Sequence, residues 1–281
     1  MKHQRLLLST LFLSACFTVG PDYEEPASAA EEMESWNGRL DGAIRPEELD
    51  PAFLAQWWTA LEDPLLTSLI ERAADANLDL RTAATQLQQA RARRKIAEAE
   101  GLPSVGTSGQ AQRSGTGDVT SELFALGIDA SWELDLFGRI ERGVEAADAE
   151  VEAAREARRD VLVSILAEVA LNYVDLRTLQ RRKAVAEEEL LQQEDSLGII
   201  RLQDEAGSAN PLDLDRAISN FESTRAKIPT LEQQIHQTRN RLAVLLGQTP
   251  GSLDAELDAP GSIPVPPIEV AVGVPNGSSK L

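Results

Sequence analysis

The sequence has little of several residue types, and each shortage excludes a class of protein. Its single cysteine, Cys16, cannot form an internal disulfide, and with only two histidines a Cys/His zinc site is excluded. The 27 basic residues against 46 acidic ones give a net charge of −19. This argues against a nucleic-acid partner, because a phosphate backbone needs a basic surface. Aromatic residues make up only 4% of the 281 residues, whereas Ala, Leu, Glu, Arg and Gln are abundant. That composition favours long helices over a thick globular core.

The N-terminal segment predicts an exported lipoprotein. A basic start is followed by the apolar stretch 6–13, which is too short to span a bilayer and is typical of a secretory signal. The sequence Leu-Ser-Ala-Cys that ends at Cys16 resembles the bacterial lipobox. We therefore expect residues 1–15 to be removed and Cys16 to carry a covalent lipid, the only bound group that the sequence predicts. Phe17, in place of the Asp linked to inner-membrane retention, indicates the outer membrane of a Gram-negative bacterium. An ordinary signal peptide with an incidental cysteine is the alternative.

Most of the chain predicts long helices. No proline occurs between Pro103 and Pro211, and no glycine between Gly143 and Gly198. The helix predicted there carries apolar residues spaced 4-3-4-3, which is typical of a coiled-coil seam: Leu162, Leu166, Val169, Tyr173 and Leu176. A return helix follows, in which Pro229 should cause a kink or an overlap of two helices.

Between Pro103 and Phe137 the apolar period changes to two, which is typical of β-strands. In the second half of this segment the apolar face, which would contact lipid if the hairpin spans a membrane, carries Leu126, Ile128, Ala130, Trp132, Leu134 and Leu136. The acidic residues of the opposite, wet face are Asp129, Glu133 and Asp135. About ten alternating residues are what a transmembrane strand requires. On periodicity alone, a soluble amphipathic hairpin fits equally well.

The segment 201–213 predicts a sharp turn between the two long helices. Gly207 can adopt the left-handed conformation that ends a helix. Asn210 is a typical N-cap, Pro211 a typical first helical residue, and Asp213 complements the positive end of the helix. Capping accounts for all these residues without invoking a function.

The sequence therefore predicts a mainly α fold with one β-hairpin: long antiparallel coiled-coil helices plus a two-stranded transmembrane hairpin. The predicted parts, in chain order, are the signal peptide 1–15, a lipid-anchored tether 16–62, a repeat unit 63–250 and a C-terminal linker 251–281. Within the repeat unit we expect a helix at 64–100, the hairpin at 103–137, a helix at 139–203, a turn at 204–210 and a helix at 211–246.

Six segments carry a resemblance to a known family. They are 15–23, 56–58, 63–66, 130–139, 207–214 and 242–247. The most specific are Cys-Phe-Thr-Val-Gly-Pro-Asp-Tyr, which starts at Cys16, and Trp-Glu-Leu-Asp-Leu-Phe-Gly-Arg, which starts at Trp132. In this order they resemble the TolC-like outer-membrane efflux proteins, in particular the NodT-type lipoprotein branch.

The resemblance implies a role for each part. The hairpin would belong to a trimeric outer-membrane β-barrel, with the acidic face toward the lumen, and the long helices would form a periplasmic α-barrel. A periplasmic adaptor, itself attached to an inner-membrane pump, would dock at the turn, whose residues of interest are Arg201, Gly207, Ser208, Asn210 and Asp213. The implied function is an efflux duct for drugs, metals or other small molecules, of the RND type.

One departure from the family is large. Its members contain two copies of the helix–hairpin–helix unit, whereas this sequence contains one and ends soon after Val-Gly-Val-Pro at 272–275. We therefore expect a truncated product. Three copies would supply six strands, fewer than the eight at which side chains already fill a barrel, so we expect no working channel from three copies. A structural envelope lipoprotein without a pore, or an inactive product, is the alternative.

An enzyme is not expected. His3 leaves with the signal peptide and His236 stands alone on a predicted coiled-coil helix. No catalytic Ser-His-Asp set, metal-ligand set or nucleotide-binding motif is present in the sequence.

Overall fold

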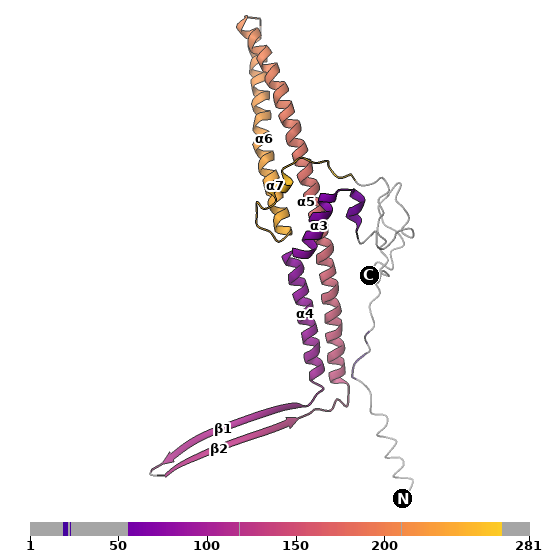
Figure 1. Ribbon diagram of the computed structural model, residues 1–281, viewed down its shortest axis with the longest axis vertical. Coiled ribbons are helices and arrows are strands. Elements are labelled where there is room, and N and C mark those ends of the chain that lie inside the picture. The colour runs from indigo at the N-terminus through magenta and orange to yellow at the C-terminus, as the bar shows by residue number, and fades with distance from the viewer. Residues whose placement is uncertain (1–18, 22, 24–55, 118, 209, 266–281) are drawn as a thin grey trace, which may run out of the picture. The chain divides into compact units, whose positions relative to one another are not determined.

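The computed structural model describes residues 19–21, 23, 56–117, 119–208 and 210–265. The chain divides into two compact units, one made of residues 1–26 and 82–159 and the other of residues 27–81 and 160–281. Helices α4 (Leu78–Ala99) and α5 (Arg139–Glu205) each contribute to both units (Figure 1). Across the described ranges, no helix combines the length and the apolar character that crossing a membrane would need.

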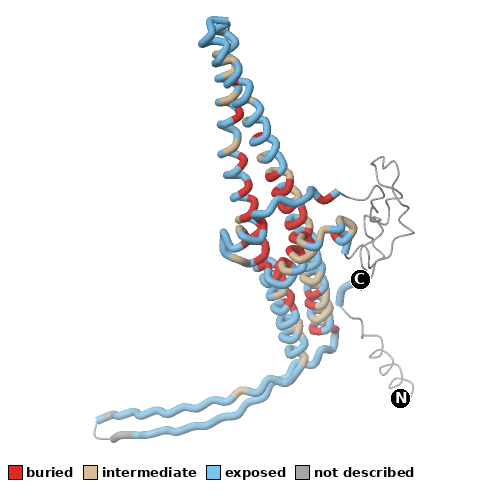
Figure 2. Tube along the Cα trace, turned by 45° about the horizontal axis from the view of Figure 1, so that its top comes forward, coloured by how far each residue is buried: buried red, intermediate tan, exposed pale blue. Residues whose placement is uncertain are grey.

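The first unit consists of a β-hairpin and a helix pair. Strands β1 (Ser104–Thr116) and β2 (Val119–Ser131) are antiparallel and paired along their full length (Figure 1). In the helix pair, Leu87 and Ala90 of α4 pack against Val151 of α5 in a small core. Arg94 of α4 also pairs with Asp148 of α5. The hairpin has no such core, and its residues lie almost entirely on the surface (Figure 2).

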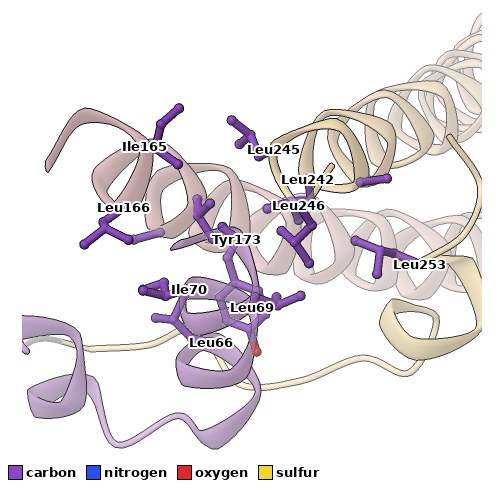
Figure 3. Packing of buried hydrophobic residues seen from close by; sticks show 14 of the residues in the cluster. Leu66, Leu69, Ile70, Ile165, Leu166, Tyr173, Leu242, Leu245, Leu246 and Leu253 are labelled. Carbon is purple, nitrogen blue, oxygen red and sulfur yellow. The ribbon is translucent and has the colours of Figure 1, made fainter. Parts of the chain in front are cut away.

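The second unit contains the main core of the described chain. The C-terminal part of α5 and helix α6 (Pro211–Leu245) run antiparallel, and α3 (Pro64–Ala76), the short 3-10 helix η2 (Trp57–Leu61) and α7 (Asp254–Leu257) complete the unit. Figure 3 shows side chains of α3, α5 and α6 meeting in this core. The predicted seam is confirmed: four of its five residues are buried and Leu162 is half-buried.

The prediction of one helix at 64–100 is wrong, because the structure has two helices there, α3 and α4. Asn77 separates them with an extended backbone (φ −60°, ψ 135°). Its Oδ1 accepts hydrogen bonds from the backbone N–H of Asp79 (2.9 Å) and Leu80 (3.0 Å), which caps α4. Its Nδ2 donates to the carbonyl of Leu245 at 2.8 Å. The partner lies 168 residues away, so a local pattern could not predict the break.

The remaining helix predictions are close to the structure. Helix α5 ends two residues later than expected, and α6 ends one residue earlier. Helix α6 contains Pro229 without ending there, so the predicted overlap of two helices does not occur. The start of α3 has the features of a typical helix N-terminus: Asp63 Oδ1 accepts from the N–H of Leu65 and Leu66, and Pro64 occupies the first turn.

Parts of the expected tether and linker belong to the folded core, which corrects both boundaries. Trp58 is only 8% exposed and belongs to the main core, although 16–62 was expected to be a tether. In the expected linker 251–281, Leu257 is fully buried. Two buried arginines hold this segment: Arg177 donates to the carbonyl of Ala259 (2.7 Å), and Arg239 donates to that of Leu257 (3.1 Å). These are long-range contacts, which composition cannot reveal.

Candidate functional site

The hairpin has one apolar face and one polar face. In an antiparallel pair, residues directly opposite each other point to the same side. The register places on one face Val105, Thr107, Gly109, Ala111, Phe124, Leu126, Ile128 and Ala130. On this face Leu126 is 96% exposed and Ile128 is 82% exposed. Bulky apolar side chains left this open to solvent indicate a surface that another apolar medium covers.

The opposite face is mostly polar. It carries Ser104, Gly106, Ser108, Gln110, Gln112, Asp129 and Ser131, interrupted by Leu123 and Ala125. Gly106 lies opposite Asp129, and a Cβ at Gly106 would come within 2.8 Å of Asp129 Oδ2. The glycine therefore leaves room for the carboxylate. Toward the loop, the apolar face ends at the exposed ion pair between Arg113 and Glu122, 3.6 Å apart.

Strand β2 ends at Ser131, so the alternation beyond it does not describe a strand. The structure corrects the placement of five residues beyond it: Trp132, Leu134 and Leu136 were expected on the apolar face, and Glu133 and Asp135 on the wet face. Asp135 Oδ2 accepts hydrogen bonds from the backbone N–H of Ile140 (2.8 Å) and Glu141 (3.0 Å) at the start of α5. A carboxylate at this position satisfies N–H groups that lack intrahelical partners. The sequence analysis missed this cap because the strand-like alternation continues through it.

The N-terminal residues that the structure describes contact the same junction, which the sequence analysis also missed. The N–H of Val19 donates to the carbonyl of Phe137 (2.9 Å), and Arg142 Nε donates to the carbonyl of Val19 (3.1 Å). The N–H of Tyr23 donates to Glu145 Oε1 (3.2 Å). Val19 and Tyr23, which were expected to belong to the tether, are thus bonded to the start of α5 and to the residues before it. Cys16, the expected lipid carrier, lies outside the described residues.

The turn between α5 and α6 is built as its residues predict. Gly207 has φ +68°, and its N–H donates to the carbonyl of Asp204 (2.8 Å) while that of Ser208 donates to Gln203 (2.9 Å). These two bonds are the pair that defines a Schellman motif. Asn210 Oδ1 then accepts from the N–H of Leu212 at 3.1 Å and caps α6.

The residues around the turn are open to contact. Arg201, Gly207, Ser208, Asn210 and Asp213 are all exposed. Asp213 lies in the first turn of α6, 3.9 Å from Arg216. Among the residues that the structure describes, no atom lies within 4 Å of the position of a Cβ added at Gly207. Strain there would come from the left-handed backbone and not from crowding.

Farther from the turn along the same helix pair, an ion pair joins α5 to α6. Lys183 Nζ lies 2.8 Å from Glu232 Oε1 and 3.4 Å from Glu187 Oε1. The hydrogen bond from Lys183 lowers the pKa of the Glu232 carboxyl, and the hydrogen bond to Glu232 raises the pKa of the Lys183 ammonium. Within the described ranges, no group of three His, Cys, Asp or Glu side chains is placed to hold a metal ion.

An exposed hairpin with an apolar face, continued by a long helical hairpin, matches a known family. The model of the family described as "Outer membrane efflux protein" matches residues 69–248. The chain belongs to the outer membrane efflux protein family. Nodulation protein T of Rhizobium leguminosarum bv. trifolii is 31% identical over 272 residues, which are 95% of this chain and 56% of that protein. The cation efflux system protein CusC of Escherichia coli is 31% identical over 242 residues, or 84% of this chain and 51% of CusC.

Solved structures agree with this assignment. The outer-membrane channel OprN superposes with a TM-score of 0.78 at 33% identity, over 92% of this chain and 57% of OprN. A crystal structure of CusC superposes with a TM-score of 0.66 at 29% identity, over 82% of this chain and 51% of CusC. The chain thus spans about half the length of the relatives that it matches. Among these relatives, CusC is named as a cation efflux system protein and OprN as an outer-membrane channel.

Proposed function

We propose that residues 63–250 form one repeat of an efflux duct in the outer membrane. The β1–β2 hairpin supplies two strands to a membrane barrel, and α4, α5 and α6 supply part of its periplasmic helical wall. The observation that carries this proposal is the apolar face of the hairpin, on which Leu126 is 96% exposed. Contact of such a face with lipid costs no free energy, whereas its contact with water is unfavourable.

The hairpin also needs neighbours on both of its edges. Each strand pairs only with the other in the described chain, and unpaired backbone groups within hydrocarbon cost several kcal/mol each. Three hairpins would supply only six strands, and eight strands already close without a lumen. The duct therefore contains more than three such hairpins, supplied by further copies or by a second repeat.

Thiol labelling of the full chain in vesicles tests the hairpin. Ile128 and Asp129 are neighbours on opposite faces, and both are exposed in the isolated chain. The Asp129→Cys variant should react with a membrane-impermeant maleimide, and the Ile128→Cys variant should be protected by lipid. The lipidated Cys16 would carry no free thiol, so it adds no background. Equal labelling of the two variants would contradict a membrane-spanning hairpin.

We propose that the turn is the docking point for a periplasmic adaptor, which would connect the duct to an inner-membrane pump. The exposure of the turn residues supports this, as does the rigid Schellman geometry around Gly207. Photo-crosslinking from Ser208 or Asn210 should capture a co-expressed adaptor, and the Gly207→Val variant should weaken the capture. The control position is Glu187, on the body of α5; crosslinks from Glu187 alone would contradict docking at the turn.

The cargo and the anchor remain parts of the same proposal. One relative is named as a cation efflux protein and another as a toluene efflux pump protein, so membership of the family is compatible with ionic and apolar cargo. The lipid anchor is proposed for Cys16, and a relative is described as a probable outer membrane lipoprotein. Mass spectrometry should find Cys16 acylated at a new N-terminus; an unmodified chain that retains Met1 would contradict the anchor.

A further inference from the structure

A short exposed apolar segment lies between the hairpin and α5. We name it the collar and define it as Trp132, Leu134, Leu136 and Phe137. Trp132, Leu134 and Phe137 are each 58% exposed, and Leu136 is 69% exposed. All four lie after the end of β2, so strand pairing does not account for them. Four large apolar side chains within six residues mark a surface that binds an apolar partner.

The polar side chains on and between the collar residues have partners within the protein. Glu133 Oε1 lies 3.3 Å from Arg139 Nη2, and Asp135 accepts from the first N–H groups of α5. Trp132 Nε1 donates to the carbonyl of Gly101 at 3.0 Å. An indole whose N–H is already bonded can enter an apolar medium without leaving a donor unsatisfied. The collar side chains therefore present carbon atoms, and the two carboxylates between them are bound by Arg139 and by the start of α5.

The N-terminal segment indicates that the apolar medium near the collar is the lipid bilayer. Val19 is bound to Phe137 through its N–H and to Arg142 through its carbonyl. Cys16 precedes Val19 by three residues, and three extended residues reach at most about 11 Å. A lipid on Cys16 therefore keeps the acylated end of the chain within about 11 Å of the residue that is bonded to the collar.

We propose that the collar is an interfacial anchor, which lies in the headgroup layer of the same leaflet that holds the lipid of Cys16. The hydrogen bonds of Val19 to Phe137 and Arg142 limit the height of the collar relative to that lipid. Indole and phenyl rings are enriched at this depth of a bilayer because one side of the layer is apolar and the other is wet. The inference uses the proposed lipidation of Cys16, and it does not require that the assembled protein conducts.

Fluorescence quenching by brominated lipids measures the depth directly. The lipidated full chain is reconstituted in phosphatidylethanolamine–phosphatidylglycerol vesicles. The emission of Trp132 is obtained by subtracting the emission of the Trp132→Phe variant from that of the unchanged chain. Bromines near the carbonyl end of the acyl chains should reduce this emission more than bromines near the methyl end. The matched control is the difference for Trp58→Phe, which reports a core indole that is 8% exposed and should not respond to either lipid.

An absence of quenching of Trp132 on vesicles that retain the protein would overturn the anchor, as would stronger quenching by the deep bromines. A second variant separates this result from the proposed function. Leu126→Trp in the Trp132→Phe background places an indole in the middle of the apolar face of β2. Deep quenching of that indole with none at Trp132 would refute the anchor and leave the membrane hairpin intact. Shallow quenching of Trp132 with none at Leu126→Trp would support the anchor and contradict the hairpin.

Discussion

The side chain of Asn77 joins two helices, α4 and α6, and its replacement gives the sharpest test of the fold. Its Oδ1 caps α4, and its Nδ2 donates to the carbonyl of Leu245 at the end of α6. The residue is 3% exposed, so water cannot replace either partner without entering the core. Both interactions are lost in the Asn77→Ala variant.

The expected cost follows from the two losses. Removal of an N-cap side chain costs about 1 kcal/mol. A buried carbonyl that is left without a donor costs about 1–3 kcal/mol more. The Asn77→Ala variant should therefore lower the free energy of unfolding by about 2–4 kcal/mol, the sum of these terms.

Asn210 provides a matched control. It caps α6 through the same kind of bond, from the N–H of Leu212 to Oδ1, but it is exposed. The Asn210→Ala variant should cost only the cap, about 1 kcal/mol. Asn77→Asp separates the two terms at the buried site, because a carboxylate keeps the cap and lacks the donor to Leu245.

Urea unfolding of the detergent-solubilised chains, followed by helical circular dichroism, measures these differences. Asn77→Ala should unfold at clearly lower urea than Asn210→Ala, with an unchanged slope. The same midpoint for both variants would refute the reasoning, since it would mean that the bridge to Leu245 contributes nothing.

Two further predictions concern the second unit. Gly247 has φ +67°, and an added Cβ would clash with the carbonyl oxygen of Ala76. Gly247→Ala should therefore lower the unfolding free energy by at least about 1–2 kcal/mol, the cost of the left-handed backbone alone. Gly198→Ala, at an uncrowded position inside α5, should instead stabilise the chain by up to about 1 kcal/mol; destabilisation by both variants to the same extent would contradict the argument. The Lys183–Glu232 pair should stabilise the unit above the ordinary glutamate pKa of 4.5, because a carboxyl whose pKa is lowered on folding loses its contribution as the pH falls through that lowered value. Urea titrations of Lys183→Met against the unchanged chain should therefore differ near neutral pH and converge in acid, and a constant difference would count against the pair.

Local patterns in the sequence are sufficient to predict the parts of the fold that depend on neighbouring residues. The alternation before Ser131 predicts the hairpin, and the absence of proline and glycine predicts α5. The turn at Gly207 and Asn210 is also predictable, because its caps are made by residues within five positions of each other. The character of the hairpin faces follows from the same alternation, since neighbouring side chains on a strand point to opposite sides.

Other features of the fold depend on contacts between residues far apart in the sequence and are visible only in the tertiary structure. The break at Asn77 depends on Leu245, 168 residues away, and the docking of Val19 depends on Phe137 and Arg142. The end of β2 was misplaced for a related reason. The pattern of Trp132 to Asp135 continues the strand period. In the structure, however, the Asp135 carboxylate accepts hydrogen bonds from the first N–H groups of α5, and a position in the strand would not bring it there. Alternation records which side chains are apolar, whereas the backbone follows the partners that satisfy its polar groups, and those become visible only when the chain is folded.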